Sequence, residues 1–267
     1  MRFVRPVLLS LALPAVALLV TTGQANAAAP SPTAPTPMAS GPVANVTMGD
    51  SSPNWAGWVA YGTKFRYVQA TFKVPKLDCR KTPGPAVASE WVGLDGAGTH
   101  TVEQDGIAAE CAHGAASYYA WWETFPKAPV YPRWRVGAGD TINTSVWYDS
   151  AARKYRFDLK DQSNGQEFSD WEKCGTSSCR DSSAEVITES PGESASGSKY
   201  YPFADCGTSS FWGISITDAG GKRGGFEYWD WSSGPVTMVG ESGHEKAATG
   251  GLGAGGTAFK TYWKQAV

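Results

Sequence analysis

The chain has 267 residues and a formal net charge of −2, with no basic stripe, which argues against nucleic acid and anionic membranes as partners. It is rich in aromatic residues, with 12 Trp and 11 Tyr. Such residues favour β-strands and line clefts that hold extended polymers such as peptides or glycans.

Residues 1–27 have the pattern of a secretory signal peptide. Arg2 and Arg5 precede an apolar run over 7–20, and Ala25-Asn26-Ala27 offers small residues for cleavage. The apolar run is too short for a stable membrane anchor. We therefore expect a secreted, extracellular protein that has no membrane association once the signal is removed.

Residues 28–50 are rich in Pro, Ala, Ser and Thr. This composition buries too little apolar surface to offset the entropy lost on folding, so we expect a flexible linker. A short pro-segment that is trimmed during maturation is the alternative. The remaining residues, 51–267, are enough for one domain with a sizeable core.

Short segments with alternating apolar and polar residues recur through 51–267, whereas no helical period is visible. Many short strands at near-regular spacing predict an all-β fold, a sandwich or a barrel. The expected strands are 54–61, 66–74, 88–94, 101–109, 116–124, 141–148, 154–160, 183–188, 210–217, 225–230, 236–239 and 257–263. The glycine-rich run 249–256 predicts a surface loop.

The five cysteines all lie in the part of the chain that we expect to be exported, where disulfides persist. Cys174 and Cys179 flank a short turn and are the best local pair. Cys79 with Cys111 is the next choice, which leaves Cys206 free, although sequence alone does not determine connectivity. A zinc site at Cys174-x4-Cys179 lacks a second ligand pair, so no metal is expected.

Familiar hydrolase motifs give little support to nucleophilic catalysis. The chain has no Gly-x-Ser-x-Gly elbow, and His244-Glu245 lacks the second histidine of a zinc-protease helix. Ser196-x-x-Lys199 lies in a Ser/Gly-rich stretch without its companion motifs. Carboxylate and amide side chains are the better candidates.

Alternation along a strand predicts which of these side chains share a face. The expected faces are Tyr119, Trp121, Glu123 and Phe125 on one strand, Glu185, Ile187 and Glu189 on a second, and Val102, Gln104 and Gly106 on a third. If these strands are neighbours, a carboxylate and a carboxamide can point into one groove.

Six segments resemble, in their order and spacing, the glutamic peptidases (eqolisins). They are Asn54-Trp-Ala-Gly-Trp58, Gln69-Ala-Thr-Phe-Lys-Val-Pro75, Glu90-Trp-Val-Gly-Leu-Asp-Gly96, Val102-Glu-Gln-Asp-Gly106, Tyr119-Ala-Trp-Trp-Glu-Thr-Phe-Pro126 and Ala184-Glu-Val-Ile-Thr-Glu189. Each motif is short, but their shared order is specific. The resemblance covers essentially all of 52–267. It implies an antiparallel two-sheet β-sandwich of the concanavalin A-like lectin/glucanase type.

The resemblance also assigns roles to particular residues. Gln104 takes the place of the family's catalytic glutamine, and Glu189 takes the place of its catalytic glutamate. Trp121 matches a tryptophan of the substrate cleft, while Glu123 and Asp95 match acidic residues that support the pair. Tyr119, a substrate-binding position, stands where an aspartate is usual.

These roles imply a secreted endopeptidase that acts at acid pH without a cofactor. Glu189 would take a proton from water and return it to the amine, while Gln104 would position the water and stabilise the oxyanion. We expect a monomer that acts on polypeptide substrates. Two alternatives stay open: a glycoside hydrolase of the same fold type using acids such as Glu103, Glu123 and Glu227, or a non-catalytic sandwich that binds polysaccharide or peptide.

Overall fold

The computed structural model describes, apart from Met1, residues 51–82, 84–193, 199–253 and 255–267. The expected signal peptide (1–27) and the linker or pro-segment (28–50) lie outside the described residues. The chain divides into residues 1–33 and 34–267, and the strands all belong to the second unit. No helix in the described residues is long and apolar enough to cross a membrane.

The described residues form strands and no helices, so the expected all-β fold is confirmed. The strands are β1 (Ser51–Ser52), β2 (Trp55–Tyr61), β3 (Phe65–Lys73), β4 (Ala86–Asp95), β5 (Val102–Ala112), β6 (Ala115–Phe125), β7 (Thr141–Asp149), β8 (Lys154–Asp161), β9 (Glu167–Glu172), β10 (Ser183–Glu189), β11 (Thr208–Asp218), β12 (Arg223–Gly224), β13 (Ser232–Val239), β14 (Glu245–Thr249) and β15 (Phe259–Trp263).

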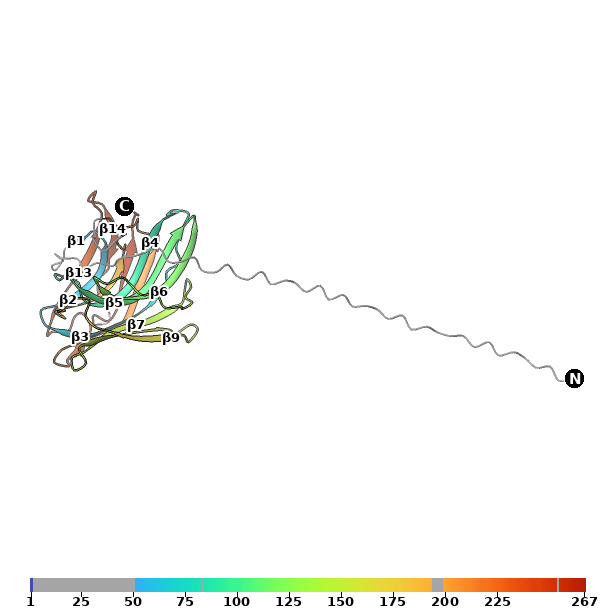
Figure 1. Cartoon of the computed structure of the whole chain (residues 1–267). Helices are drawn as coiled ribbons and strands as arrows, with labels where there is room; N and C mark the ends of the chain where they lie inside the picture. Colours follow the sequence, from blue (N-terminus) through green and yellow to red (C-terminus); the bar gives the residue numbers. More distant parts are fainter. Residues whose placement is uncertain (2–50, 83, 194–198, 254) are drawn as a thin grey trace. The chain divides into compact units, whose positions relative to one another are not determined.

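The strands make two layers, which Figure 1 shows with β3, β7 and β9 beneath β4, β5 and β6. In the first sheet, β6, β5, β4, β10 and β2 lie side by side in that order; in the second, the order is β15, β11, β3, β7, β8, β9. β13 joins them, because residues 232–236 pair with β2 while Met238 and Val239 pair with β14. All strand pairs are antiparallel except the short β1–β13 pair. This is the antiparallel sandwich that the sequence predicted.

The main core lies between the two sheets. The first sheet contributes Val92, Ile107 and Trp122, which pack with second-sheet residues such as Val146 and Phe157. Trp122 stacks on Phe157 with ring centroids 5.1 Å apart. Because side chains alternate along a strand, the neighbours of these residues must face the other side of the first sheet.

That other face carries a second apolar cluster, built around Trp55, Trp91, Trp121 and Ile187. The rings of Trp55 and Trp91 meet edge to face with centroids 5.0 Å apart. Aromatic residues bury large areas and hold their neighbours in fixed positions. The first sheet therefore has a packed, rigid platform on each side.

Both disulfides that the sequence favoured are present. Cys79 is bonded to Cys111 and Cys174 to Cys179, while Cys206 is buried and free. The first bond ties the loop after β3 to the end of β5, and the second closes the turn before β10.

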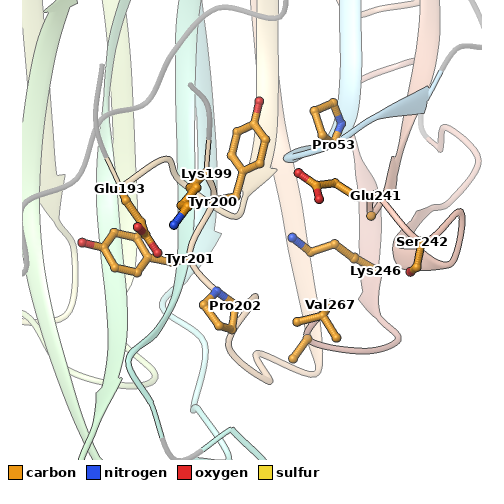
Figure 2. A pocket seen from close by; sticks show the side chains of 12 residues that line it. Pro53, Glu193, Lys199, Tyr200, Tyr201, Pro202, Glu241, Ser242, Lys246 and Val267 are labelled. Atoms are coloured by element: carbon orange, nitrogen blue, oxygen red, sulfur yellow. The ribbon is translucent and has the colours of Figure 1, made fainter. Parts of the chain in front are cut away.

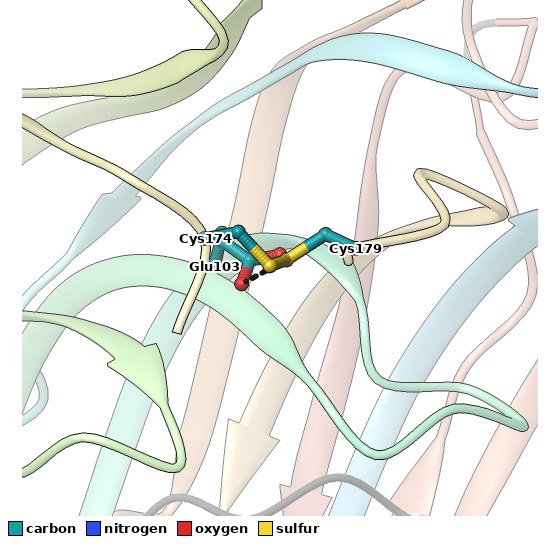
Figure 3. A group of neighbouring side chains, drawn as sticks. All are labelled: Glu103, Cys174 and Cys179. Atoms are coloured by element: carbon teal, nitrogen blue, oxygen red, sulfur yellow. Dashed lines mark hydrogen bonds between the residues drawn. A yellow bond between two sulfur atoms is a disulfide. The ribbon is translucent and has the colours of Figure 1, made fainter. Parts of the chain in front are cut away.

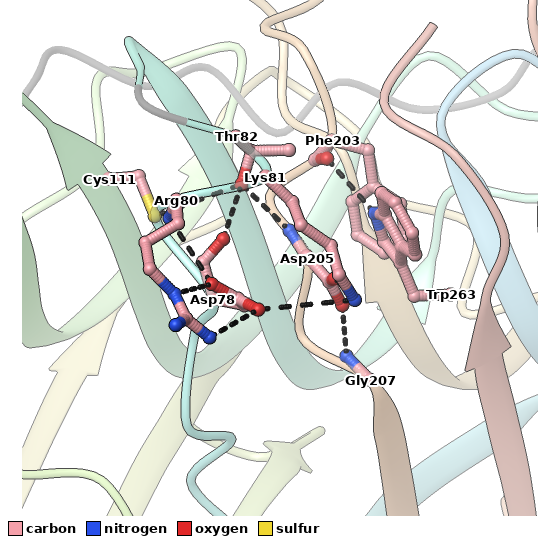
Figure 4. A network of polar contacts seen from close by, with 9 residues as sticks. All are labelled: Asp78, Arg80, Lys81, Thr82, Cys111, Phe203, Asp205, Gly207 and Trp263. Carbon is pink, nitrogen blue, oxygen red and sulfur yellow. Dashed lines mark hydrogen bonds and ion pairs between the residues drawn. The ribbon is translucent and has the colours of Figure 1, made fainter. Parts of the chain in front are cut away.

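A polar network holds the loop around the first disulfide against the C-terminal part of the domain (Figure 4). Lys81 Nζ lies 2.8 Å from Asp205 Oδ2, and the backbone N–H of Asp205 donates to Thr82 Oγ1 at 3.1 Å. Trp263 Nε1 donates to the carbonyl of Phe203 at 3.1 Å. The Lys81 side chain is largely exposed, so the network fixes loop position more than it adds stability.

The expected strand at 225–230 is wrong, because these residues form consecutive turns. Gly225 lies against the backbone of Gly256, where a Cβ atom would come within 2.6 Å of it. Phe226 donates its N–H to Gly256 at 2.9 Å and is buried in the core. The apolar residues of this segment therefore serve the packing of a turn, which alternation alone cannot distinguish from a strand.

The sequence also gave no sign of β9, an edge strand that pairs only with β8. Its side chains are half-buried or exposed and include Glu167, Asp170 and Glu172. Edge strands carry charge because charge discourages pairing with other chains. A polar segment of this kind has a weak apolar period.

Candidate active site

The site is built on one face of four contiguous strands, β6, β5, β4 and β10. Gln104 on β5 is in register with Glu123 on β6 and with Gly93 on β4. Glu189, the last residue of β10, is in register with Ser89 on β4. The faces expected from alternation are the ones observed, since Ile187 and Trp121 belong to the cluster on this face and Val186 and Trp122 to the core.

Glu189 is fully buried, and two N–H groups converge on its carboxylate. Asn54 Nδ2 donates to Oε1 at 2.8 Å, and Trp91 Nε1 donates to Oε2 at 2.8 Å. Hydrogen bonds from N–H donors to a carboxylate are charge-assisted and stabilise its ionised form. The arrangement suits a group that must carry a negative charge inside the protein.

Local structure orients both donors. Ser52 Oγ donates to Asn54 Oδ1 at 3.1 Å, which turns the amide NH₂ of Asn54 toward Glu189. The Trp91 side chain can pack close to the sheet because the residue in register with it is Gly106, which has no side chain. A Cβ atom at Gly106 would come within 2.6 Å of the Trp91 side chain.

Gln104 donates from Nε2 to Glu123 Oε2 at 2.7 Å, and both side chains are buried. Burial raises the pKa of Glu123 well above its usual range; the hydrogen bond from Gln104 opposes this shift, and the charge of Glu189 adds to it. The raised pKa favours the protonated form of Glu123 at acid pH, whereas the two N–H donors favour the ionised form of Glu189. A pair of carboxyl groups whose environments differ in this way can divide acid and base roles.

A second glutamate, Glu185, lies on the same face of β10. Glu185 is in register with Gly93 on β4, and Gly93 is in register with Gln104 on β5. Burial raises the pKa of Glu185 well above the usual range, and the charge of Asp95 adds to the shift. The raised pKa favours the protonated form of Glu185, whereas two N–H donors favour the ionised form of Glu189. The two glutamates on this face of β10 thus have opposite electrostatic environments.

The expected substrate-binding residues lie beside this centre. Trp121 is buried in the apolar cluster and donates from Nε1 to Ser89 Oγ at 3.1 Å. Tyr119 is half-buried; its hydroxyl donates to the carboxylate of Glu110, and its ring meets that of Tyr131 edge to face.

Asp95, expected to support the pair, has contacts of a different kind. Its carboxylate accepts hydrogen bonds from the backbone N–H groups of Arg180, Asp181 and Ser182, at 2.6 to 2.8 Å. It makes no hydrogen bond to Gln104 or Glu189 among the described residues. Asp95 thus anchors the segment that leads into β10.

Glu103 faces the opposite side of β5 and lies against the second disulfide (Figure 3). Burial raises its pKa well above the usual range, and the charges of Asp95 and Asp181 add to the shift. The possible metal-ligand atoms of Glu103, Cys174 and Cys179 lie within 4.8 Å of one another. The two sulfurs are bonded to each other, however, and cannot serve as thiolate ligands of a metal ion.

The position of Glu103 also weakens the glycoside hydrolase alternative. Glu103 and Glu123 lie on opposite faces of the first sheet, so they cannot flank one glycosidic bond. Glu227, the third acid considered, is exposed in the turn that replaces the expected strand at 225–230.

Two residues of the site, Asn54 and Trp91, were not singled out by sequence reasoning. Both stand in segments that carry the family resemblance, which is the signal that could have identified them. Their role depends on the pairing of β10 with both β2 and β4, which no local pattern shows.

An antiparallel β-sandwich with a buried carboxylate and a carboxamide on one face fits a hydrolase that activates water by acid–base chemistry. The chain belongs to the Peptidase A4 family, whose model matches residues 53–240. It is accordingly a glutamic-type endopeptidase, and this expectation from the sequence is confirmed.

Solved structures of such enzymes share the fold. Scytalido-glutamic peptidase with a transition state analogue inhibitor matches with a TM-score of 0.68 and 23% identity, covering 80% of this chain and 99% of that one. SCP-B, an eqolisin in complex with the tripeptide Ala-Ile-His, matches with a TM-score of 0.62 and 22% identity over the same shares. Aspergilloglutamic peptidase from Aspergillus niger gives 0.56 and 23%, covering 67% and 99%. A comparison with curated proteins finds no match.

Proposed function

We propose that this peptidase hydrolyses peptide bonds with Glu189 as the general base and then acid, and with Gln104 as the residue that positions water and stabilises the oxyanion. The observation that carries the proposal is the pair of N–H donors on Glu189, set against Glu123, whose pKa is raised by burial. Polypeptides are the substrates, and the protein acts as a monomer.

The reaction needs a base that activates water, an acid that protonates the leaving nitrogen and a donor that stabilises the oxyanion. Ionised Glu189 takes a proton from water as the oxygen attacks the peptide carbonyl, and then delivers that proton to the leaving nitrogen; such help is worth roughly 10²–10⁴-fold in rate. The carboxamide of Gln104 has an oxygen that can hold the water and N–H groups that can donate to the oxyanion. A single oxyanion donor contributes about 3–4 kcal/mol.

We propose that the enzyme acts at acid pH because of Glu123, the acidic neighbour of the Gln104–Glu189 pair. Glu123 contacts Gln104 directly, so its ionisation would place a negative charge beside the developing oxyanion. Because the pKa of Glu123 is raised, this charge is absent at acid pH and accumulates as the pH rises. Activity should therefore be lost on the alkaline side.

Secretion is the remaining part of the proposal. The pattern of residues 1–27 supports it, as do the two disulfides, which persist in oxidising compartments.

The test compares two glutamates on the same face of one strand. Casein or denatured haemoglobin is digested across pH 2–8 with wild type, Glu189→Gln and Glu185→Gln, and the fragments are sequenced. We expect no turnover by folded Glu189→Gln, because an amide cannot accept the proton, and clear turnover by Glu185→Gln, because burial already favours the protonated form of Glu185. If folded Glu189→Gln keeps more than about a tenth of the wild-type kcat, the role of Glu189 as general base is wrong. Release of reducing sugar from β-glucan without any peptide cleavage would support the glycosidase alternative instead.

A further inference from the structure

A cavity of about 420 Å³, whose lining residues Figure 2 shows, contains Lys246, and Lys246 Nζ donates at 3.1 Å to Ser190 Oγ, in the residue that follows Glu189. The titratable side chains that line the cavity are Glu193, Lys199, Tyr200, Tyr201, Glu241 and Lys246, and Val267, the last residue of the sequence, also lines it. Pro53, which also lines it, precedes Asn54, the residue whose amide binds Glu189. The chain therefore connects the cavity to the candidate active site at two places, through Pro53 and through the residues that follow Glu189.

Two tyrosines strengthen this link. Tyr201 packs against the apolar cluster that contains Trp55, Trp91 and Trp121. The pKa of Tyr200 is raised by burial and, to a smaller extent, by the charge of Glu189, so Tyr200 lies within electrostatic reach of that carboxylate. Tyr200 and Tyr201 thus connect the cavity to the surroundings of Glu189.

Lys246 is the unusual feature of the cavity. Its residue is only 4% exposed, and its Nζ donates to Ser190 Oγ at 3.1 Å. Within the described residues this is the only hydrogen bond that Nζ makes, and no carboxylate of these residues lies within ion-pair distance of Nζ. An ammonium group has three N–H donors, and a buried charge costs free energy unless it is paired.

The charge of Lys246 persists under the conditions in which the enzyme is expected to act. Burial lowers the pKa of Lys246 to about 8, and the charge of Glu241 opposes the shift. The ammonium form therefore dominates at acid and neutral pH. Glu241 is exposed and not paired with it, so a carboxylate that enters the cavity can compete for Lys246.

From this geometry we infer that the cavity is a subsite for a carboxylate group of the peptide substrate, held by Lys246 next to Glu189. The inference rests on the proposed peptidase mechanism, since Glu189 sets where the scissile bond lies. Two sources could supply the carboxylate: an acidic side chain of the peptide or its C-terminal carboxylate. Such groups ionise above about pH 4 and can pair with Lys246 from there upward.

The test uses pairs of peptides that differ in one carboxylate. One set exchanges Glu for Gln at each position in turn, and the other exchanges a C-terminal acid for an amide. The ratio of kcat/KM within each pair is measured at pH 5 for wild type, Lys246→Met and Lys246→Arg. Lys64→Met, which removes an exposed lysine outside the cavity, is the matched control.

We expect wild type to prefer one carboxylate peptide by about tenfold, which corresponds to ~1.4 kcal/mol. Lys246→Met should bring that ratio close to one, while Lys64→Met should leave it unchanged and Lys246→Arg should keep much of it. The set that shows the preference identifies the source of the carboxylate. Cleavage without any such preference, or a preference that survives in Lys246→Met, overturns the inference and leaves the peptidase mechanism standing.

A second measurement does not depend on turnover or on a variant. N-acetylglutamate, which has an α- and a side-chain carboxylate, and N-acetylglutamine amide, which has neither, are titrated into the wild-type protein, and NMR follows the backbone amide signals of Ser190 and Tyr201. We expect saturable shifts with N-acetylglutamate and much smaller ones with N-acetylglutamine amide. Equal responses to the two probes, or none, contradict the carboxylate subsite even if no peptide is cleaved.

Discussion

Trp91 Nε1 donates a 2.8 Å hydrogen bond to Glu189 Oε2, although the two residues are not opposite each other on their paired strands. Trp91 is in register with Ile187, so its indole extends two residues along β10 to reach the carboxylate of Glu189. This diagonal contact, together with the amide of Asn54, gives Glu189 an environment that no other glutamate of the face shares.

Removing the indole donor should raise the pH at which Glu189 becomes ionised and can accept a proton. Trp91→Phe keeps an aromatic ring against Trp55 but deletes one of the two N–H donors. A hydrogen bond to a charged group contributes about 1.5–3 kcal/mol, so the acid limb of the pH–rate profile should move up by roughly one unit or more. Trp121→Phe is the matched control, since its N–H binds Ser89 and not Glu189. An acid limb that stays in place in Trp91→Phe would show that this donor does not serve the base.

Gln104→Glu tests whether the carboxamide is needed. The change replaces one NH₂ by oxygen beside Glu123, so carboxyl groups would crowd the same space and resist joint ionisation. We expect a severe loss of activity, with any remainder shifted to lower pH, where a protonated acid can still donate to the oxyanion. The pH–rate profiles of purified, folded variant and wild type make the comparison. Near-normal activity with an unchanged profile would mean that Gln104 is an ordinary strand residue.

Glu123→Gln should extend activity toward neutral pH. The amide preserves an oxygen that can accept from Gln104 but cannot ionise, so the negative charge that accumulates in wild type as the pH rises is removed. We expect the alkaline limb of kcat/KM to move to higher pH while the acid limb changes less. Profiles from pH 3 to 8 on a neutral peptide would measure this. If both limbs coincide with those of wild type, ionisation of Glu123 does not limit the enzyme.

Stability should fall as the pH rises, in part because of Glu90. Burial raises the pKa of Glu90 to about 7 from its ordinary value of 4.5, and the hydrogen bond from Ser209 opposes the shift. A raised pKa means that the folded state binds the proton more tightly, so this contribution is present below pH 4.5 and is lost as the pH rises through 7. The loss from this one residue is roughly 3 kcal/mol.

Urea unfolding of wild type and Glu90→Gln between pH 4 and 8 measures that loss. The variant keeps an oxygen that can accept from Ser209 and cannot ionise, so its free energy of unfolding should decline less with pH. Glu227→Gln, at an exposed position, is the control and should follow wild type. Parallel curves for wild type and Glu90→Gln would exclude Glu90 as a source of the pH dependence.

Much of the local structure was predictable because a strand's side chains alternate with a strict period of two. That period placed Gln104, Glu123 and Glu189 on their faces, and it separated Trp121 from Trp122. It failed at 225–230, where apolar residues pack a turn, and at the polar edge strand β9, because local pattern does not report tertiary packing.

The sequence by itself determined the β class of the fold, the faces of the strands and, through the order of short motifs, the family and the two candidate residues. Only the tertiary structure decided what surrounds them: that Asn54 and Trp91 converge on Glu189, that Asp95 anchors the entry to β10 and that Lys246 faces a cavity beside the site. The physical reason is that alternation acts between neighbours along the chain, whereas an electrostatic environment is set by strands paired across long sequence distances, such as β10 with β2 and β4.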